Sequence, residues 1–276
     1  MTRRPIHLTH ALRALALGCL LAAAPVLAAP GDPLGGDDTG CAPTTKQGLS
    51  CGKKVLTSLV KLRKAVLVCH LKQAGLAFKA GQGQPGFSNA EENCEIGPSN
   101  KSAKNTFDAR MTNLAGAGCD ATVLANANTR RDILLGDQNT AGSMDALNAT
   151  FFCDPTSGNL IDPGGDDGGY IPSTPEHYKC SVAVAKLWYR LDAYVSKCHI
   201  KLATAVWAGK VFDEEACEDV GDRSALTKYD TYVARYIQAG ICPPCLADPP
   251  GALGLGTSTV ADADANLQEV YICPGP

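Results

Sequence analysis

The sequence is poor in aromatic residues and in the motifs that carry catalysis. Only 6% of its 276 residues are aromatic, and 28 glycines and 17 prolines interrupt the chain. A nucleophile elbow, a glycine-rich phosphate loop that opens a helix and a HExxH zinc motif are all absent from it. These absences disfavour one large single-core enzyme domain, so we expect a non-enzymatic protein built of small packed units.

Long apolar runs are also missing, except at the N-terminus. Residues 1–28 contain three arginines, no acidic residue and an apolar stretch that ends in Val26-Leu27-Ala28. The stretch is shorter than the ~20 residues that a membrane span requires. This pattern is typical of a secretory signal peptide that is cleaved after Ala28. We therefore expect a secreted or periplasmic protein with no transmembrane segment in the mature chain.

Cysteine, by contrast, is abundant. Of the 13 cysteines, Cys19 lies within the expected signal peptide, and the even number that remains predicts six disulfides in an oxidising compartment. Removal of residues 1–28 also takes the net charge from −3 to −6. A negative charge of this size argues against a nucleic-acid partner.

The cysteines recur in two copies of one pattern. In each copy a cysteine precedes a Cys-His pair by 18 residues, and two further cysteines follow the pair. The pairs are Cys69-His70 and Cys198-His199, and apolar neighbours match as well, which indicates a duplicated small domain. The expected organisation is a signal peptide (1–28), a flexible leader (29–50), repeat 1 (51–153), a Gly/Asp/Pro-rich linker (154–179) and repeat 2 (180–276).

Each repeat begins with a long helical pattern, Lys53–Lys79 or Ser181–Ala208, and continues with a second, shorter one. Ser99 and Asp222 are candidate N-caps of the shorter helices. We therefore expect an all-α fold of two tandem, disulfide-stapled antiparallel helical hairpins with short irregular or β accessory segments. The expected β segments are Ala149–Phe152 and Glu269–Ile272.

Helical geometry also predicts the disulfide pairing. Cysteines 18 residues apart are five turns apart, so they project from one side of a helix at positions ~27 Å apart along its axis. A cystine joins Cα atoms only ~4.4–6.8 Å apart, so each must bond to the returning helix. The predicted hairpin disulfides are Cys51–Cys119, Cys69–Cys94, Cys180–Cys242 and Cys198–Cys217. The remaining four cysteines are less determined, and by analogy between the repeats we prefer Cys41–Cys153 and Cys245–Cys273.

Three segments of repeat 2 carry a resemblance to known sequences. They are Lys197-Cys198-His199-Ile200-Lys201-Leu202-Ala203, Asp213-Glu214-Glu215-Ala216-Cys217 and Ala239-Gly240-Ile241-Cys242. Together they resemble an uncharacterised cysteine-repeat family of secreted proteins from myxobacteria-like bacteria. The resemblance covers both repeat cores and implies stapled helical hairpins, but it carries over no catalytic residue. Repeat 1 departs from it in a longer loop, Ala80–Asn93.

Two features suggest an alternative function, that of a small exported thiol-redox or metal-binding protein. Cys242-Pro243-Pro244-Cys245 has the CxxC spacing of redox proteins, but it follows a helix instead of opening one, and we favour two separate structural cystines. His70 and His199 suggest a metal or haem site that uses both halves. We favour histidines packed at the hairpin tips, and we assign neither a metal ligand nor a cofactor.

The acidic runs are interpreted as solvated turns. Gly35-Gly36-Asp37-Asp38 lies in the expected leader, and Gly164-Gly165-Asp166-Asp167 lies in the expected linker, where a calcium site is the alternative. Glu214-Glu215 is likewise expected to be solvated. Asp262-Ala263-Asp264-Ala265-Asn266 begins like an EF-hand loop but lacks the glycine and the glutamate that this loop requires.

Basic residues form a stripe on each long helix, and a polyanion is the partner class that such stripes fit: an acidic glycan, an anionic lipid surface or an acidic protein. The stripe residues are Lys54, Lys61, Lys72, Lys79, Lys186, Arg190, Lys197 and Lys201. The predicted function is that of an exported, disulfide-rich, non-catalytic interaction or structural module whose partner the sequence does not identify.

Overall fold

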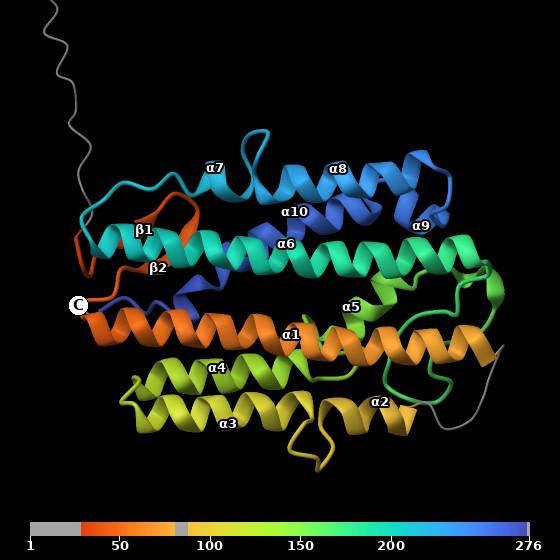
Figure 1. Ribbon diagram of the computed structural model, residues 1–276, viewed down its shortest axis with the longest axis horizontal. Helices are drawn as coiled ribbons and strands as arrows, with labels where there is room; N and C mark the ends of the chain where they lie inside the picture. Colours follow the sequence, from red (N-terminus) through yellow and green to blue (C-terminus); the bar gives the residue numbers. More distant parts are fainter. Residues whose placement is uncertain (1–28, 81–87, 275–276) are drawn as a thin grey trace, which may run out of the picture.

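The computed structural model describes residues 29–80 and 88–274. The expected signal peptide and residues 81–87 of the repeat 1 loop lie outside the described residues. Two long helices, α1 (Lys46–Ala80) and α6 (Pro175–Trp207), lie side by side and antiparallel at the centre of the molecule (Figure 1). Among the described residues no helix has the combination of length and apolarity needed to cross a membrane.

Each long helix forms the hairpin that the sequence predicts. Helix α3 (Ala103–Gly116) returns along α1, and α8 (Ala225–Gln238) returns along α6. The short helices α2 (Ser88–Glu95) and α7 (Glu215–Glu218) precede these returning helices and contact the long ones. The all-α, disulfide-stapled hairpin fold is therefore confirmed.

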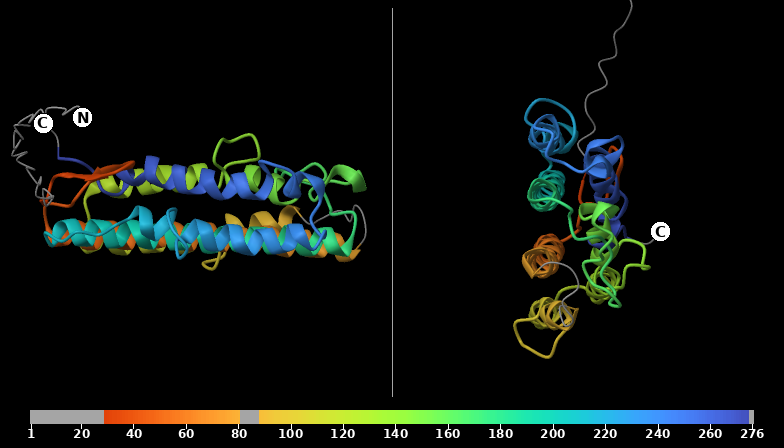
Figure 2. Two further views of the ribbon diagram at one scale, coloured as in Figure 1. Left: turned by 90° about the horizontal axis from the view of Figure 1, so that it is seen from above. Right: turned by 90° about the vertical axis from the view of Figure 1, so that its right-hand side faces the viewer.

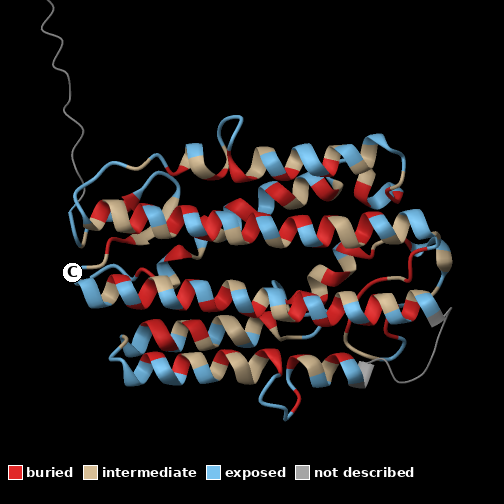
Figure 3. Cartoon of the chain, in the orientation of Figure 1, coloured by how far each residue is buried: buried red, intermediate tan, exposed pale blue. Residues whose placement is uncertain are grey.

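A second layer of shorter elements covers one face of the hairpins (Figure 2). It contains α4 (Ala121–Leu134), α5 (Met144–Phe151), α9 (Pro244–Ala247), α10 (Gly251–Ala265) and an antiparallel ribbon of β1 (Pro33–Gly35) and β2 (Asp38–Cys41). Two 3₁₀ turns, η1 (Pro155–Ser157) and η2 (Leu267–Glu269), complete the described elements. Buried residues line both long helices and the inner sides of the elements packed on them (Figure 3).

The apolar stripes of the long helices explain this packing. Val55, Leu62 and Val66 of α1 are at most 1% exposed, and Val184 and Val195 of α6 are fully buried. Burial of each such side chain contributes ~1.5–3 kcal/mol. A single apolar core includes residues of both repeats.

The starts of the returning helices differ from the sequence prediction. Ser102 caps α3 by accepting a hydrogen bond from the Asn105 amide, and Ser224 caps α8 by accepting one from the Thr227 amide. The predicted caps, Ser99 and Asp222, lie in the preceding turns. A serine hydroxyl reaches the third helical amide only from the residue that directly precedes the helix.

The predicted β segments are wrong. Residues 149–151 end α5, and Glu269 ends the 3₁₀ turn η2. The two described strands lie instead in the segment that we expected to be a flexible leader, where Pro33 pairs with Cys41 and Gly35 with Asp38. Short runs of apolar and aromatic residues do not distinguish a strand from a buried helix end.

All four predicted hairpin disulfides are present: Cys51–Cys119, Cys69–Cys94, Cys180–Cys242 and Cys198–Cys217. The preferred pairing of the other four cysteines is wrong. The structure forms Cys41–Cys273 and Cys153–Cys245, so both of these bonds join the two repeats. The analogy between the repeats led us to pair cysteines within one half of the chain. In the structure the last cysteine of each repeat lies against the other half of the chain and bonds to a cysteine there.

An ion pair at the centre of the molecule reveals how the repeats are related. Arg63 of α1 contacts Asp192 of α6 at 2.6 Å, and 129 residues separate them. The same offset separates His70 from His199, so Arg63 and Asp192 occupy equivalent positions of the two repeats. Where two equivalent helices run antiparallel, equivalent positions meet at the two-fold axis that relates them. The repeats are therefore arranged like the subunits of a symmetric dimer, joined in one chain.

Candidate metal centres

The buried histidine of α1 is surrounded by carboxylates. The Nε2 atom of His70 lies 2.7 Å from Glu95 Oε1, 3.2 Å from Asp145 Oδ1, 3.2 Å from Asp167 Oδ1 and 3.3 Å from Glu91 Oε1. Each of the five residues is at most 4% exposed. We call these residues the His70 cluster. Four carboxylates from three separate segments therefore converge on a single nitrogen atom.

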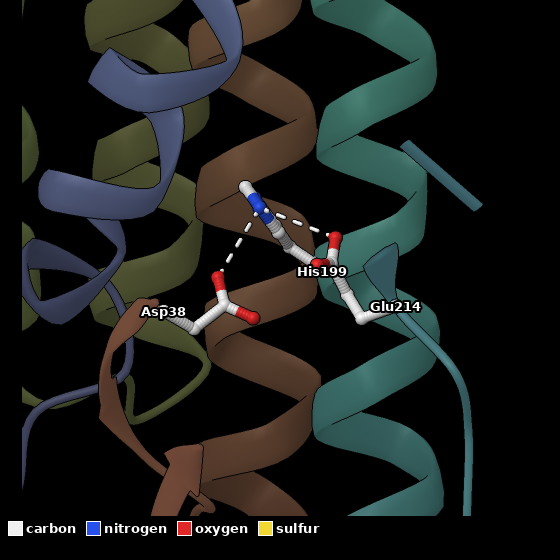
Figure 4. Close-up of side chains that lie close together, drawn as sticks. All are labelled: Asp38, His199 and Glu214. Atoms are coloured by element: carbon white, nitrogen blue, oxygen red, sulfur yellow. Dashed lines mark ion pairs between the residues drawn. The ribbon is translucent and has the colours of Figure 1, made fainter. Parts of the chain in front are cut away.

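Repeat 2 builds the same arrangement around His199 of α6. Its Nε2 atom lies 3.0 Å from Asp264 Oδ1, 3.1 Å from Glu218 Oε2, 3.3 Å from Asp38 Oδ1 and 3.5 Å from Glu214 Oε1. We call these residues the His199 cluster. Figure 4 shows Asp38 and Glu214 approaching the imidazole from two different elements. The five side chains are at most 6% exposed.

The two clusters use equivalent residues. Glu91 and Glu95 belong to the segment Glu91-Glu92-Asn93-Cys94-Glu95, and repeat 2 has the same pattern in Glu214-Glu215-Ala216-Cys217-Glu218. The spacing of four residues places both outer glutamates on one face of a helix. Asp145 and Asp264 occupy corresponding places, in α5 and α10, shortly before the last cysteine of each repeat.

The fifth member of each cluster comes from the segment that precedes the other repeat: Asp38 from the expected leader and Asp167 from the expected linker. Asp38 and Asp167 end the two Gly-Gly-Asp-Asp segments, each 13 residues before the first hairpin cysteine of its own repeat. Asp38 precedes α1 but contacts His199 of α6, whereas Asp167 precedes α6 but contacts His70 of α1. Each cluster thus contains one carboxylate from the segment that leads into the other long helix. Neither repeat contains a full cluster by itself.

A disulfide holds each cluster together. His70 directly follows Cys69 and Glu95 directly follows Cys94, so the Cys69–Cys94 bond joins the helix that carries the histidine to the helix that carries the glutamates. Cys198–Cys217 does the same for His199 and Glu218. Groups fixed in this way lose less conformational freedom when they bind a ligand.

Hydrogen bonding does not explain these contacts. An imidazole nitrogen donates one hydrogen, which serves one acceptor well, yet four carboxylates surround each Nε2 atom. His70 Nε2, Glu91 Oε1, Glu95 Oε1 and Asp167 Oδ1 have no hydrogen-bond partner of acceptable geometry. Unpartnered buried polar atoms are rare in native proteins, and a bound cation would satisfy the carboxylate oxygens and the imidazole nitrogen together.

The electrostatics of the clusters lead to the same conclusion. Burial, with neighbouring carboxylates, raises the pKa of Glu91 to about 8 and that of Asp167 to about 8. In the His199 cluster the same causes raise the pKa of Glu214 to about 10 and that of Glu218 to about 9. Without further positive charge these carboxyl groups therefore keep their protons at neutral pH, and ionising all four requires more positive charge than one imidazolium supplies.

The contact distances match the separations between ligands of one metal ion. Ligands bound ~2.1 Å from a cation at right angles lie ~3 Å apart, and the nitrogen–oxygen distances here run from 2.7 to 3.5 Å. Ligand atoms of His70, Glu91 and Glu95 lie within 4.8 Å of one another, as do those of His199, Glu218 and Asp264. Each cluster is able to hold one cation with one nitrogen and four oxygen ligands.

The two histidines do not form a joint site. His70 and His199 lie seven residues beyond the Arg63–Asp192 contact, in opposite directions along antiparallel helices. Their Cα atoms are therefore roughly 21 Å apart along the helix axes. A single site that contains both histidines is therefore wrong, and each histidine has its own cluster.

The other residues singled out in the sequence lie elsewhere. Cys242 and Cys245 belong to two different disulfides, with Cys180 and Cys153. All eight residues of the basic stripes are exposed, and none forms an ion pair within the described part of the chain. His177 lies outside both clusters, 2.7 Å from Asp154.

The structure corrects the interpretation of the acidic runs as solvated turns. Asp167 and Glu214 were expected to be solvated but are 3% and 6% exposed, and the segments 29–50 and 154–179 each supply a cluster residue. Two repeated acidic patterns in the sequence could have indicated these clusters. Both Gly-Gly-Asp-Asp segments have the 129-residue offset of the histidines, and the Glu-Glu-x-Cys-Glu pattern recurs around one cysteine of each repeat.

Comparison of the chain with models of protein families, with curated proteins and with solved structures found no match. The resemblance to secreted cysteine repeats therefore stays a prediction.

Proposed function

We propose that this protein is an exported metal-binding protein that holds one cation in the His70 cluster and one in the His199 cluster. The observation that carries the proposal is the repetition: one histidine and four carboxylates, buried and largely without hydrogen-bond partners, assembled twice from equivalent residues. Both repeats retain the histidine and the same types of acidic residue at equivalent positions, although much of the surrounding sequence differs.

The ligand set selects the class of metal. Calcium and magnesium prefer oxygen ligands and water, whereas structural zinc sites favour four nitrogen or sulfur ligands. One imidazole with four carboxylates suits a first-row divalent ion of higher coordination number, and Mn²⁺ or Fe²⁺ fits best. Two such ions would neutralise half of the charge of the eight cluster carboxylates.

The number of protein ligands favours binding over catalysis at both clusters. All five side chains of each cluster are buried, whereas a catalytic metal is typically held by three protein ligands and keeps a position open to water or substrate. The proposal is therefore one of binding without a catalytic step at these two positions. This keeps the non-enzymatic expectation and replaces an unspecified partner with a metal ion.

Export is supported by the six disulfides, which persist in oxidising compartments. Two of these bonds lie beside the cluster histidines. An oxidising environment would therefore assemble the metal sites as well as the fold.

Metal content measured on purified protein tests the proposal. The oxidised chain is stripped with a chelator, dialysed against Mn²⁺ and analysed by plasma mass spectrometry. We expect two tightly bound ions per chain, and one each in the variants His70→Ala and His199→Ala. His177→Ala is the matched control, since this histidine lies outside both clusters, and it should retain two. Equal metal content in all four proteins would contradict the proposal.

A further inference from the structure

A second group of acidic residues lies directly outside the His199 cluster. Glu215 follows the cluster residue Glu214, and Asp37 precedes the cluster residue Asp38. Single oxygen atoms of Asp37, Glu214 and Glu215 lie within 4.8 Å of one another. Asp38 and Glu214 therefore contact His199, while the residues next to them, Asp37 and Glu215, belong to this outer group.

Glu214 belongs to both groups. It is 6% exposed, and neither of its carboxylate oxygens has a hydrogen-bond partner. One oxygen lies 3.5 Å from His199 Nε2. A buried carboxylate with two unpartnered oxygens is able to bridge two cations, and the ions of two-metal sites lie ~3.5–4 Å apart.

The charge around the cluster exceeds what one cation neutralises. Seven carboxylates gather in this region, and none of them pairs with a lysine or arginine among the described residues. The seven are Asp37, Asp38, Glu214, Glu215, Glu218, Asp219 and Asp264. One divalent ion balances only two of these carboxylates in their ionised form, so ionisation of the others favours a second cation.

The backbone leaves room for the outer group. A Cβ atom at Gly36 would lie 3.2 Å from Glu215 Oε1, which is tighter than ordinary van der Waals contact. Gly36 also has a positive φ of 63°, which other residues adopt only with strain. The glycine before Asp37 therefore lets the Glu215 carboxylate approach this turn.

We propose that Asp37, Glu214 and Glu215 hold a second divalent cation, bridged through Glu214 to the ion in the His199 cluster. The inference rests on the proposed function, because the bridge requires an occupied inner position. The outer position is the weaker of the two and faces water, since Asp37 is exposed and Glu215 is half-buried. It is suited to receive a cation from solution before the buried position does.

Repeat 1 has a related pair. The Glu92 carboxyl lies against Asp166, as Glu215 lies against Asp37. The repeat 2 group contains one acid more, because Ile96 occupies the place of Asp219. The test is therefore made in repeat 2.

Mn²⁺ binding to the full, oxidised chain distinguishes the two positions. The metal-free protein is titrated with Mn²⁺, and bound ions are counted while electron paramagnetic resonance reports whether they are isolated or coupled. We expect the double variant Asp37→Asn/Glu215→Gln to bind one ion fewer than wild type and to lose the signal of a coupled pair. Asp222→Asn, an exposed change nearby, is the matched control and should behave as wild type.

The outcomes separate the two proposals. If wild type and the double variant bind the same number of ions with the same uncoupled signal, the outer position does not exist, while the inner sites stand. If His199→Ala binds as many ions as wild type, the proposed function fails at this cluster, and the outer position fails with it. Far-ultraviolet circular dichroism of each metal-free variant checks that the helices are intact.

Discussion

Asp38 offers the sharpest test of how the two repeats share their sites. It lies in β2, ahead of the first long helix, yet its carboxylate contacts His199 of repeat 2 at 3.3 Å. The substitution Asp38→Asn keeps the shape of the side chain and removes its negative charge. We expect it to weaken metal binding at the His199 cluster alone, although it lies more than 150 residues away in the chain.

The size of the effect follows from the position of the side chain. Asp38 is one of five proposed direct ligands, and its side chain is 2% exposed, so water does not replace it freely. Loss of a residue that merely orients a ligand weakens metal binding ~10–100-fold. Loss of a charged ligand should cost at least ~100-fold, which corresponds to ~2.7 kcal/mol of binding free energy.

Two histidine backgrounds identify the site that Asp38 serves. In a His70→Ala background, where only the His199 cluster binds, Asp38→Asn should lower the Mn²⁺ affinity by the full factor in calorimetric titration. In a His199→Ala background it should have no effect on the remaining site. Asp167→Asn is the matched control and should give the opposite pattern. A loss caused by Asp38→Asn in the His199→Ala background would refute the assignment of Asp38 to the His199 cluster.

Three further predictions concern stability and assembly. First, the free energy of unfolding of the metal-free protein, measured by chemical denaturation, should fall as the pH rises from about 5 to about 8. The reason is that buried carboxyl groups such as Glu91, with a pKa of about 8, still hold protons in the folded state at pH values where the unfolded chain has released them. The cluster histidines, whose pKa is raised by their carboxylate partners, act in the same direction. Bound Mn²⁺ should remove most of this loss of stability. A metal-free protein that is more stable at pH 8 than at pH 5 would contradict the cluster electrostatics. Second, Arg63→Met should lower the free energy of unfolding by about 3 kcal/mol, since it leaves Asp192 buried without its partner. The swapped pair Arg63→Asp/Asp192→Arg should recover most of that loss because the two positions are equivalent, and a swap no better than the single change would argue against the two-fold axis. Third, replacing Cys69 and Cys94 by alanine should weaken metal binding at the His70 cluster and leave the His199 cluster intact; equal weakening of both sites would indicate a general loss of structure.

The basic stripes remain a separate prediction. All eight residues are exposed and unpaired within the described part of the chain, as a polyanion-binding face requires. Retention on a heparin matrix at low salt should fall when Lys54, Lys61, Lys72 and Lys79 become glutamine, because the attraction depends on charge. Wild-type protein that is not retained would leave the stripes as solvated helix faces.

The sequence by itself determined the framework of the fold. Helical periodicity and the 18-residue cysteine spacing led to two hairpins and to four of the six disulfides, because a straight helix converts spacing along the chain into direction and distance. The duplicated Cys-His pair revealed the repeat for the same reason: it is a local pattern. Nothing in these inferences required knowledge of how distant segments meet.

Only the tertiary structure determines which residues of the two halves of the chain contact each other. The pairing of Cys41 with Cys273 and of Cys153 with Cys245 depends on the packing of each repeat's end against the other repeat. The clusters depend on it as well, because Asp38 reaches His199 across 161 positions of the chain. Local patterns specify helices and turns, whereas the meeting of a turn with a distant helix is set by the shared core and the two-fold packing of α1 against α6. The acidic runs therefore looked solvated in the sequence, and the fold buried them around the histidines.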